Sequence, residues 1–269
     1  MNNIIDKIIF SILEDDDRVE KSGTDKLEWA KKALQREHID GDLDLSYIQI
    51  SDLGNLKSIT GNLNLKYTKL KSLGSLKSVG GDLILDNTSI TDLGSLESVG
   101  GNLKLYGVHI TSLGSLRSVD GWLDLRNTPI TKLGPLKLGG SLYLSESFIE
   151  DLGPLKSVNC DLILNTSHIS NLGSLESVKG NLYLQYCFSL KSLGSLKSVG
   201  GDLRLSGTPV TDLGSLEKVG GELDLSDTTL LTSLGSLRSV GKKIILTNRS
   251  KIDINSLPRY FRKKIVIKH

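Results

Sequence analysis

Side chains that act as nucleophiles or metal ligands are few in this sequence and lie far apart. Cys160 and Cys187 form no C-x-x-C motif and no disulfide framework, and we expect both to be buried structural thiols. His109 and His168 are separated by 59 positions and have no cysteine or histidine beside them. No nucleophile stands in a recognisable pattern with a base. The sequence therefore predicts no enzyme, no metal site and no cofactor.

Aromatic and cationic side chains point to a different chemistry, the recognition of a macromolecule. Tyrosine, tryptophan and arginine are the residues that interfaces favour, because they combine a large contact area with a polar group. The predicted partner-binding residues are Lys104, Tyr106, Trp122, Arg126, Tyr143, Tyr183, Tyr186 and Arg204. The alternative is an aromatic ladder without a partner, since aromatic residues also favour exposed strands.

A repeat of about 20 residues positions these side chains. Residues 61–80 read GNLNLKYTKLKSLGSLKSVG, and residues 81–100 read GDLILDNTSITDLGSLESVG. The unit G-x-L-x-L-x-x-T-x-I-x-x-L-G-x-L-x-S-V-x occurs ten times from Gly41, and a degenerate copy begins at Lys242. Self-similarity at this period predicts a solenoid in which each unit forms one coil.

The pattern inside the unit predicts a short strand and two bends. Since L-x-L has a period of two, its leucines point inward and the residues between and after them point outward. Six of the seven tyrosines fall on these outward positions. The glycine that follows a later leucine in every unit predicts a bend with positive φ, and the Gly-Gly pairs predict a second bend. The Asp or Asn before the first leucine is expected to hydrogen-bond the local turn backbone.

Two other features of the repeat bear on its surface. The unit that begins at Gly121 is one residue short, and the units that begin at Gly180 and Gly221 are one residue long. The residue after L-G-x-L is charged in every unit, as in Lys57 and Glu97. We interpret this column as a solvated ridge, and a second contact surface is the alternative.

The segment LILDNTSITDL, from Leu83, resembles the leucine-rich repeat, with Thr where that family usually has Asn. The segment S-V-G-G-x-L-x-L is also similar to the coils of receptor L domains. The resemblance implies an α/β-type repeat solenoid dominated by short parallel β-strands, of leucine-rich-repeat or right-handed β-helix-like form. It implies a binding module without indicating the partner. Because a hydroxyl has fewer hydrogen-bonding sites than an amide, we expect a straighter coil than the usual horseshoe.

The chain divides into three predicted parts: an N-terminal helical cap over residues 1–40, ten repeats over 41–241, and a C-terminal cap over 242–269. Isoleucines at i, i+4 spacing predict a helix over residues 2–14. A second helix is predicted over 24–37, with Thr24 as N-cap and Leu27, Ala30 and Leu34 facing inward. These helices cap the first coil or, alternatively, dock a partner or a second copy.

The C-terminal part is basic, with nine Lys or Arg against one acidic residue from Lys242 onward. We expect Ile265 and Ile267 to close this end of the core. The cationic cluster is either a solvated end or a contact for an acidic partner or nucleic acid; its members are Arg259, Arg262, Lys263, Lys264 and Lys268.

Together these features predict a non-enzymatic scaffold that binds a protein through its exposed aromatic strand face. A structural or assembly protein, for example of a viral particle, and a polyanion binder are the alternatives. No apolar run reaches 18 residues, so no membrane segment is predicted. The lack of a signal-peptide pattern and of a disulfide framework favours the cytoplasm. The near-identity of the repeats favours a phage or bacterial source.

Overall fold

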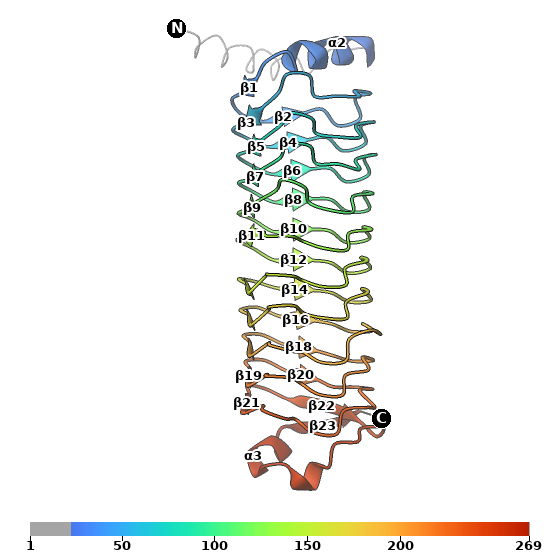
Figure 1. Cartoon of the computed structure of the whole chain (residues 1–269), viewed down its shortest axis with the longest axis vertical. Coiled ribbons are helices and arrows are strands. Elements are labelled where there is room, and N and C mark those ends of the chain that lie inside the picture. Colours follow the sequence, from blue (N-terminus) through green and yellow to red (C-terminus); the bar gives the residue numbers. More distant parts are fainter. Residues whose placement is uncertain (1–22, 269) are drawn as a thin grey trace, which may run out of the picture.

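The computed structural model describes residues 23–268, which form a single column of stacked coils (Figure 1). Sheets of parallel strands run along the column, and the strands of each sheet come from successive coils. The column is straight in this view and has no horseshoe curvature. The predicted parallel β-solenoid is therefore confirmed, and its straightness agrees with the expectation from the threonine column.

The main sheet contains twelve strands, and its register pairs the first leucine of each coil with that of the next. The ten predicted repeats supply ten of these strands, and the C-terminal part adds two. Its strands are β2 (Leu43–Asp44), β4 (Leu63–Asn64), β6 (Leu83–Ile84), β8 (Leu103–Lys104), β10 (Leu123–Asp124), β12 (Leu142–Tyr143), β14 (Leu162–Ile163), β16 (Leu182–Tyr183), β18 (Leu203–Arg204), β20 (Leu223–Asp224), β22 (Ile244–Thr247) and β23 (Ile265–Lys268).

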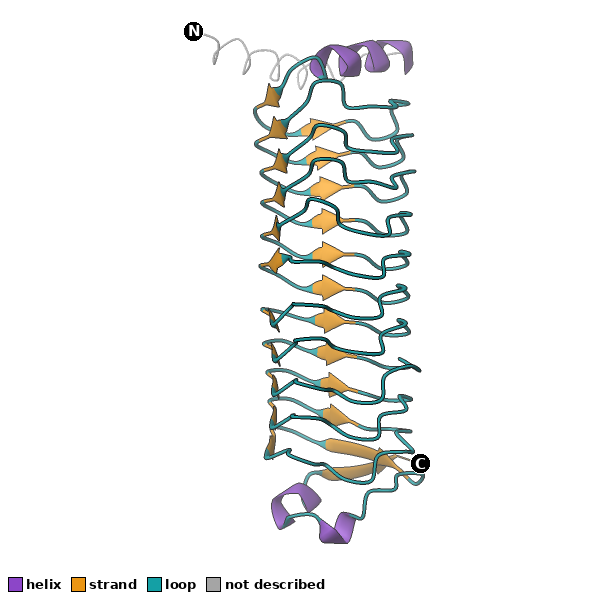
Figure 2. Cartoon of the chain, viewed as in Figure 1, coloured by secondary structure: helices purple, strands orange, loops and turns teal. Residues whose placement is uncertain are grey.

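A second column of strands is formed by the S-V segments and is divided into two sheets. The first six strands are β1 (His38–Ile39), β3 (Ser58–Ile59), β5 (Ser78–Val79), β7 (Ser98–Val99), β9 (Ser118–Val119) and β11 (Lys137–Leu138). The other five are β13 (Ser157–Val158), β15 (Ser177–Val178), β17 (Ser198–Val199), β19 (Lys218–Val219) and β21 (Ser239–Val240). Figure 2 shows this column on the left, above and below the interruption.

The strands of the main sheet are shorter than L-x-L predicted, because a tight turn begins directly after the second leucine. That leucine still joins the ladder, as the bond from the Leu65 amide to the Ile84 carbonyl (2.9 Å) shows. Two residues later the backbone is left-handed, with φ of 59° at Tyr67 and 58° at Tyr186. The outward tyrosines at these places therefore lie in a turn, where the prediction put them on a strand.

The threonine column closes this turn. The buried hydroxyls of Thr88, Thr128, Thr208 and Thr228 each donate to the carbonyl of the second leucine of their own coil, at 2.6–2.7 Å. Each bond spans three residues and so holds the chain in the reversal. This column stabilises each coil internally, while the backbone ladders join one coil to the next.

The glycines of the L-G-x-L segments all have positive φ, which confirms the predicted bend; they are Gly54, Gly74, Gly94, Gly114, Gly134, Gly153, Gly173, Gly194, Gly214 and Gly235. The Gly-Gly pairs also lie at a bend, but for another reason. Neither Gly80 nor Gly81 has a positive φ. A Cβ on Gly80 would overlap the carbonyl oxygen of Thr60 in the preceding coil, so glycine allows the coils to approach each other.

The N-terminal end is covered by one described helix, α2 (Gly23–Ala33). Ala30 and Leu34 are buried and Leu27 packs against the core, as predicted. Thr24 lies inside the helix and is not its N-cap. The helix ends before Glu37 because the Glu37 carbonyl accepts hydrogen bonds from Lys57 and Ser58 in the ladder. The predicted helix 2–14 lies outside the described residues.

The C-terminal end is closed by β22, β23, the 3-10 turn η1 (Ile254–Ser256) and α3 (Arg259–Arg262) (Figure 1). Phe261 of α3 is buried and packs against the hydrophobic core at this end. Ile265 is only partly buried and Ile267 is exposed, so the prediction that both isoleucines close the core is wrong for Ile267. The reason is that Ile265–Lys268 lies at the edge of the sheet, and no strand in the described part of the chain pairs beyond it to cover the side chains.

Candidate functional site

The predicted partner-binding residues lie on the main sheet and on the turn that follows it. Lys104, Tyr143, Tyr183 and Arg204 are the second residues of β8, β12, β16 and β18. Trp122 directly precedes β10. The remaining three residues occupy the turn and are Tyr106, Arg126 and Tyr186. The face thus spans two surfaces of the coil, although the sequence pattern predicted one.

Five of the eight residues form one connected group, which we call the central cluster: Lys104, Tyr106, Trp122, Arg126 and Tyr143. The Lys104 ammonium lies 5.3 Å from the centre of the Trp122 ring, and Trp122 meets Tyr143 edge to face at 5.9 Å. The Arg126 guanidinium lies 5.6 Å from the ring of Tyr106 and 5.7 Å from that of Tyr143. Cation–π contacts of this kind fix the orientation of both partners.

Arg126 is held in place by Asp124. The guanidinium donates from Nε to Oδ1 at 2.9 Å and from Nη2 to Oδ2 at 2.6 Å, which is the bidentate geometry of an arginine–carboxylate pair. The Asp124 side chain is only 6% exposed, whereas that of Arg126 is 47% exposed. The hydrogen bonds to Asp124 raise the pKa of Arg126 above its ordinary value. The cluster therefore presents a half-exposed guanidinium, paired with Asp124 and fixed in position between two tyrosines.

A shallow groove of about 520 Å³ begins at the central cluster and runs across the turns of the next coils. Tyr106 and Arg126 line one part of it and Tyr186 another, and its remaining lining is polar: Ser145, Glu146, Asn165, Thr166 and Gln185. The Tyr186 ring packs over Gly207, where a Cβ would overlap it. The groove joins Tyr186 to the central cluster, which the sequence alone did not show.

Tyr183 and Arg204 form a separate pair. The Arg204 guanidinium lies 5.0 Å from the Tyr183 ring and 3.9 Å from the Asp202 carboxylate. Ile163 of β14 stands between Tyr143 and Tyr183 in the register. These two residues are therefore on the same face as the central cluster but make no ring contact with it among the described residues.

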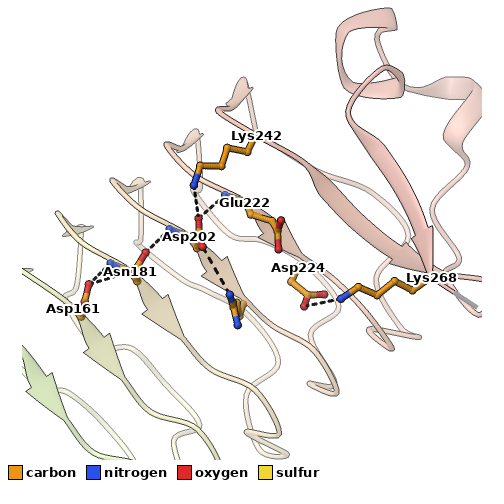
Figure 3. A network of polar contacts seen from close by, with 8 residues as sticks. Asp161, Asn181, Asp202, Glu222, Asp224, Lys242 and Lys268 are labelled. Carbon is orange, nitrogen blue, oxygen red and sulfur yellow. Dashed lines mark hydrogen bonds and ion pairs between the residues drawn. The ribbon is translucent and has the colours of Figure 1, made fainter.

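The Asp and Asn residues before the first leucine form a ladder between coils. Each side-chain oxygen accepts a hydrogen bond from the backbone N–H of the next residue in the column. The Asp161 carboxylate accepts from Asn181 at 2.7 Å, the Asn181 side-chain oxygen from Asp202 at 2.8 Å, and the Asp202 carboxylate from Glu222 at 2.8 Å (Figure 3). The predicted structural role is confirmed, but the bonds cross to the next coil and do not close a local turn. Because these side chains are engaged, they are not candidates for recognition.

Figure 3 also shows how the last strand is tied to the sheet. Lys268 of β23 reaches Asp224 of β20, with 3.9 Å between Nζ and Oδ2. Lys264 donates to the carbonyls of Val240 and Gly241. Two of the five cations of the C-terminal cluster therefore contact the end of the solenoid.

An exposed apolar corner beside the groove was missed by sequence reasoning. Phe148 is 52% exposed and stacks on His168 at 4.7 Å, and Phe188 is 73% exposed and lies 6.2 Å from Tyr186. Phe188 and the exposed Leu230 occupy the extra turns made by the two one-residue insertions. Apolar residues at these insertions were the signal that could have identified this corner.

The cysteines differ in their environment. Cys187 is fully buried in the threonine column, and burial raises the pKa of its thiol to about 11. Cys160 is exposed, so the prediction that both thiols are buried is wrong. Cys160 takes a glycine place two residues after β13, which pairs with no strand of the preceding coil among the described residues. Over residues 23–268, no three His, Cys, Asp or Glu side chains gather as metal ligands would.

Comparisons with known proteins give a family but no relative. A family model described as Toastrack DUF4097 matches residues 19–232, most of the 269-residue chain. Neither the curated proteins nor the solved structures contain a match. Among the described residues, no helix has the length and apolar character needed to cross a bilayer.

Proposed function

The chain belongs to the Toastrack DUF4097 family, whose description names no activity, and we propose its function from the geometry of the site. We propose a non-enzymatic scaffold that binds a protein partner through the central cluster and the adjoining groove. The observation that carries this proposal is the fixed position of Arg126 between Tyr106 and Tyr143. An arginine clamped by a nearly buried aspartate loses little side-chain entropy when a partner binds. Aromatic residues and arginine are also the side chains that dominate binding energy at interfaces.

The exposed corner supports the same proposal. Large apolar side chains that are half exposed or more gather along this side of the groove, and contiguous apolar patches mark interaction sites. Tyr186 belongs to both surfaces, since it lines the groove and lies beside Phe188. We therefore propose that the partner contacts the groove and the corner together.

The test is affinity capture from a native lysate with three forms of the chain, followed by mass spectrometry. The Trp122→Ala/Tyr143→Ala variant removes two rings of the central cluster. The matched control, Tyr47→Ala/Tyr67→Ala, removes two exposed rings that stack on each other at 4.8 Å elsewhere on the column. A partner retained by the unmutated chain and by the control, but lost with the cluster variant, supports the proposal. Equal recovery with all three forms would move the site away from the cluster.

A second variant separates charge from geometry. Arg126→Lys keeps the positive charge but cannot make the bidentate contact to Asp124. We expect the captured partner to bind this variant about tenfold more weakly or worse, since a fixed guanidinium and a mobile ammonium are not equivalent at a bidentate site. Unchanged affinity would mean that the charge alone, and not the clamped arginine, is recognised.

Assembly is the second candidate function, and one observation favours it. In the described part of the chain, no strand pairs with the outer edge of β23, where Val266 and Ile267 are exposed. An open strand edge is a template for pairing with another chain. Sedimentation of the full chain and of a Val266→Lys/Ile267→Lys variant tests this, because only edge pairing predicts an assembly that the variant loses.

Three finer interpretations are also proposals. The likeness to leucine-rich repeats rests on the L-x-L-x-x-T-x-I-x-x-L segment. A cytoplasmic location rests on two unpaired thiols, Cys160 and Cys187. A phage or bacterial source rests on the near-identity of the repeats.

A further inference from the structure

The second column of strands is interrupted at one place, between β11 and β13. The main sheet continues past this place, since Leu142 of β12 pairs with Leu162 of β14. The two coils are therefore joined by strand pairing along the main sheet and not along the second column (Figure 2). A groove lies at this interruption, and we call it the seam groove.

The sequence explains the interruption. The unit that begins at Gly121 lacks the residue that should follow Lys137, so Lys137 pairs at the place of Ser118 and Leu136 is shifted outward. The serine of L-G-S-L is replaced by Pro135 in this coil and by Pro154 in the next. Proline has no amide hydrogen and a fixed φ, so it does not reproduce the regular turn.

The seam groove has an apolar floor. Leu136 and Leu155 are partly exposed, whereas the equivalent leucine is buried in the other eight repeats. The groove has a volume of about 570 Å³. Its lining includes Leu136, Leu155 and the two prolines. A defect in the packing of an otherwise regular core has thus opened an apolar slot on the surface.

Main-chain groups are also free at the seam groove. At the regular seams, four backbone hydrogen bonds join the corner of one coil to the next, as in the bonds from Glu176, Ser177, Lys179 and Gly180. Within the described part of the chain, no backbone bond joins Lys156, Ser157 or Asn159 to the preceding coil. The Asn159 side chain alone reaches across, to the Leu138 carbonyl at 3.5 Å. Free strand edges accept an extended chain.

The rim of the seam groove is mainly cationic. Arg117, Lys137 and Lys156 line it, against one acidic side chain, Asp120. Three other cations of this column pair with acids of the adjacent coil: Lys57 with Glu37, Lys197 with Glu176 and Arg238 with Glu217. Lys137 has no ion pair among the described residues, and Lys156 acts on Glu176 only through its charge. The rim therefore carries positive charge that an acidic ligand would complement.

We propose that the seam groove binds an extended acidic peptide segment of a partner protein. Apolar side chains of the segment would contact Leu136 and Leu155, its backbone would pair with the free edge of β13, and its carboxylates would meet Lys137 and Lys156. This surface belongs to the second column of strands and is independent of the central cluster on the main sheet.

The probe is a fluorescein-labelled nine-residue peptide that alternates glutamate and valine, with a lysine–valine peptide as the opposite-charge probe. Fluorescence anisotropy with the full chain should show binding of the acidic peptide and about tenfold weaker or no binding of the basic one. Lys137→Glu/Lys156→Glu should weaken binding of the acidic peptide by about tenfold or more. Lys71→Glu/Lys77→Glu makes the same change of charge on a regular coil and should leave the binding unchanged.

A seam-closing variant tests the role of the opening itself. It inserts one serine after Lys137 and carries Pro135→Ser and Pro154→Ser, which restores the regular unit. We expect it to fold, as measured by circular dichroism, and to lose the peptide. The Trp122→Ala/Tyr143→Ala variant should bind the peptide normally, so failure here and failure of the proposed function are distinguishable.

Any of four results would overturn the proposal. The first three are no binding of the acidic peptide to the unmutated chain, full binding by the seam-closing variant, and equal weakening by the two charge variants. The fourth is a concentration-dependent dimer that only the seam-closing variant loses, which would assign the groove to a second copy.

Discussion

The threonine column offers a matched pair of substitutions whose effects on stability should have opposite signs. The Thr68 and Thr208 hydroxyls are both buried and occupy the same place in their coils. Thr208 donates to the Leu205 carbonyl at 2.7 Å, whereas the Thr68 oxygen has no hydrogen-bond partner. Valine fits this place, because Val108 occupies it in another coil and is fully buried.

The hydrogen bonding of the threonine hydroxyl sets the expected change in the free energy of unfolding for each variant. A buried polar group without a partner costs about 1–3 kcal/mol, so Thr68→Val should raise the free energy of unfolding by about 1 kcal/mol. A satisfied hydrogen bond contributes about 1 kcal/mol, so Thr208→Val should lower it by a similar amount. The Leu205 carbonyl keeps the Thr208 amide as a donor at 3.1 Å, which limits the loss.

Urea unfolding followed by circular dichroism measures both variants. With a denaturant slope of about 2–3 kcal/mol/M, each change moves the midpoint by roughly 0.3–0.5 M, in opposite directions and with the slope unchanged. If both variants lose stability by the same amount, the hydrogen-bond partner of the hydroxyl does not decide the stability of the turn, and the account of the threonine column given above is wrong.

Three further predictions concern single side chains. Thr166 has a left-handed φ of 57° and is exposed, so Thr166→Asn should stabilise the chain by about 1 kcal/mol in the same urea assay, because asparagine tolerates this conformation better than a β-branched residue. A thiol reagent at pH 8 should modify Cys160 quickly and Cys187 only after unfolding, because Cys187 is buried and its pKa is about 11; two fast thiols in the native chain would contradict this. The hydrogen bond from Lys197 lowers the pKa of Glu176, so the stabilisation it gives is present above pH 4.5 and is lost as the pH falls through the lowered value; an NMR titration should place the Glu176 midpoint below 4.5, and Lys197→Met should raise it toward the ordinary value.

The repeat made most of the fold predictable. Ten copies of one unit supply ten independent observations of which places are apolar, so the inward positions of the leucines and the glycine bends followed directly. The alternation of L-x-L, however, does not show where a strand ends. In the coils of Thr88 and Thr128 this turn is held by a hydrogen bond from the threonine hydroxyl to a carbonyl three residues earlier, and the sequence pattern contains no sign of it.

The candidate site was predicted in part for the same reason. Residues in the same or neighbouring columns of a parallel register lie close together, and Lys104, Trp122 and Tyr143 do so. The groove from Arg126 to Tyr186 depends on how far successive turns project from the column, and the aligned repeats do not show this distance. The error at Cys160 has a related cause, because the repeat shows that Cys160 takes a glycine place but does not show how exposed that place is.

Changes in the length of the repeat unit coincide with several of the exposed apolar side chains of this solenoid. The two coils lengthened by one residue expose Phe188 and Leu230 at one corner, and the coil shortened by one residue exposes Leu136 at the seam groove. Each change places an apolar side chain in water, which is unfavourable by roughly 1.5–3 kcal/mol for a side chain that could be buried. For Leu136 the other coils show that a regular unit would avoid this cost, since the equivalent leucine is buried in eight of them. Stability alone therefore does not account for the shortened coil, and the partner proposed above would cover the side chains that these length changes expose.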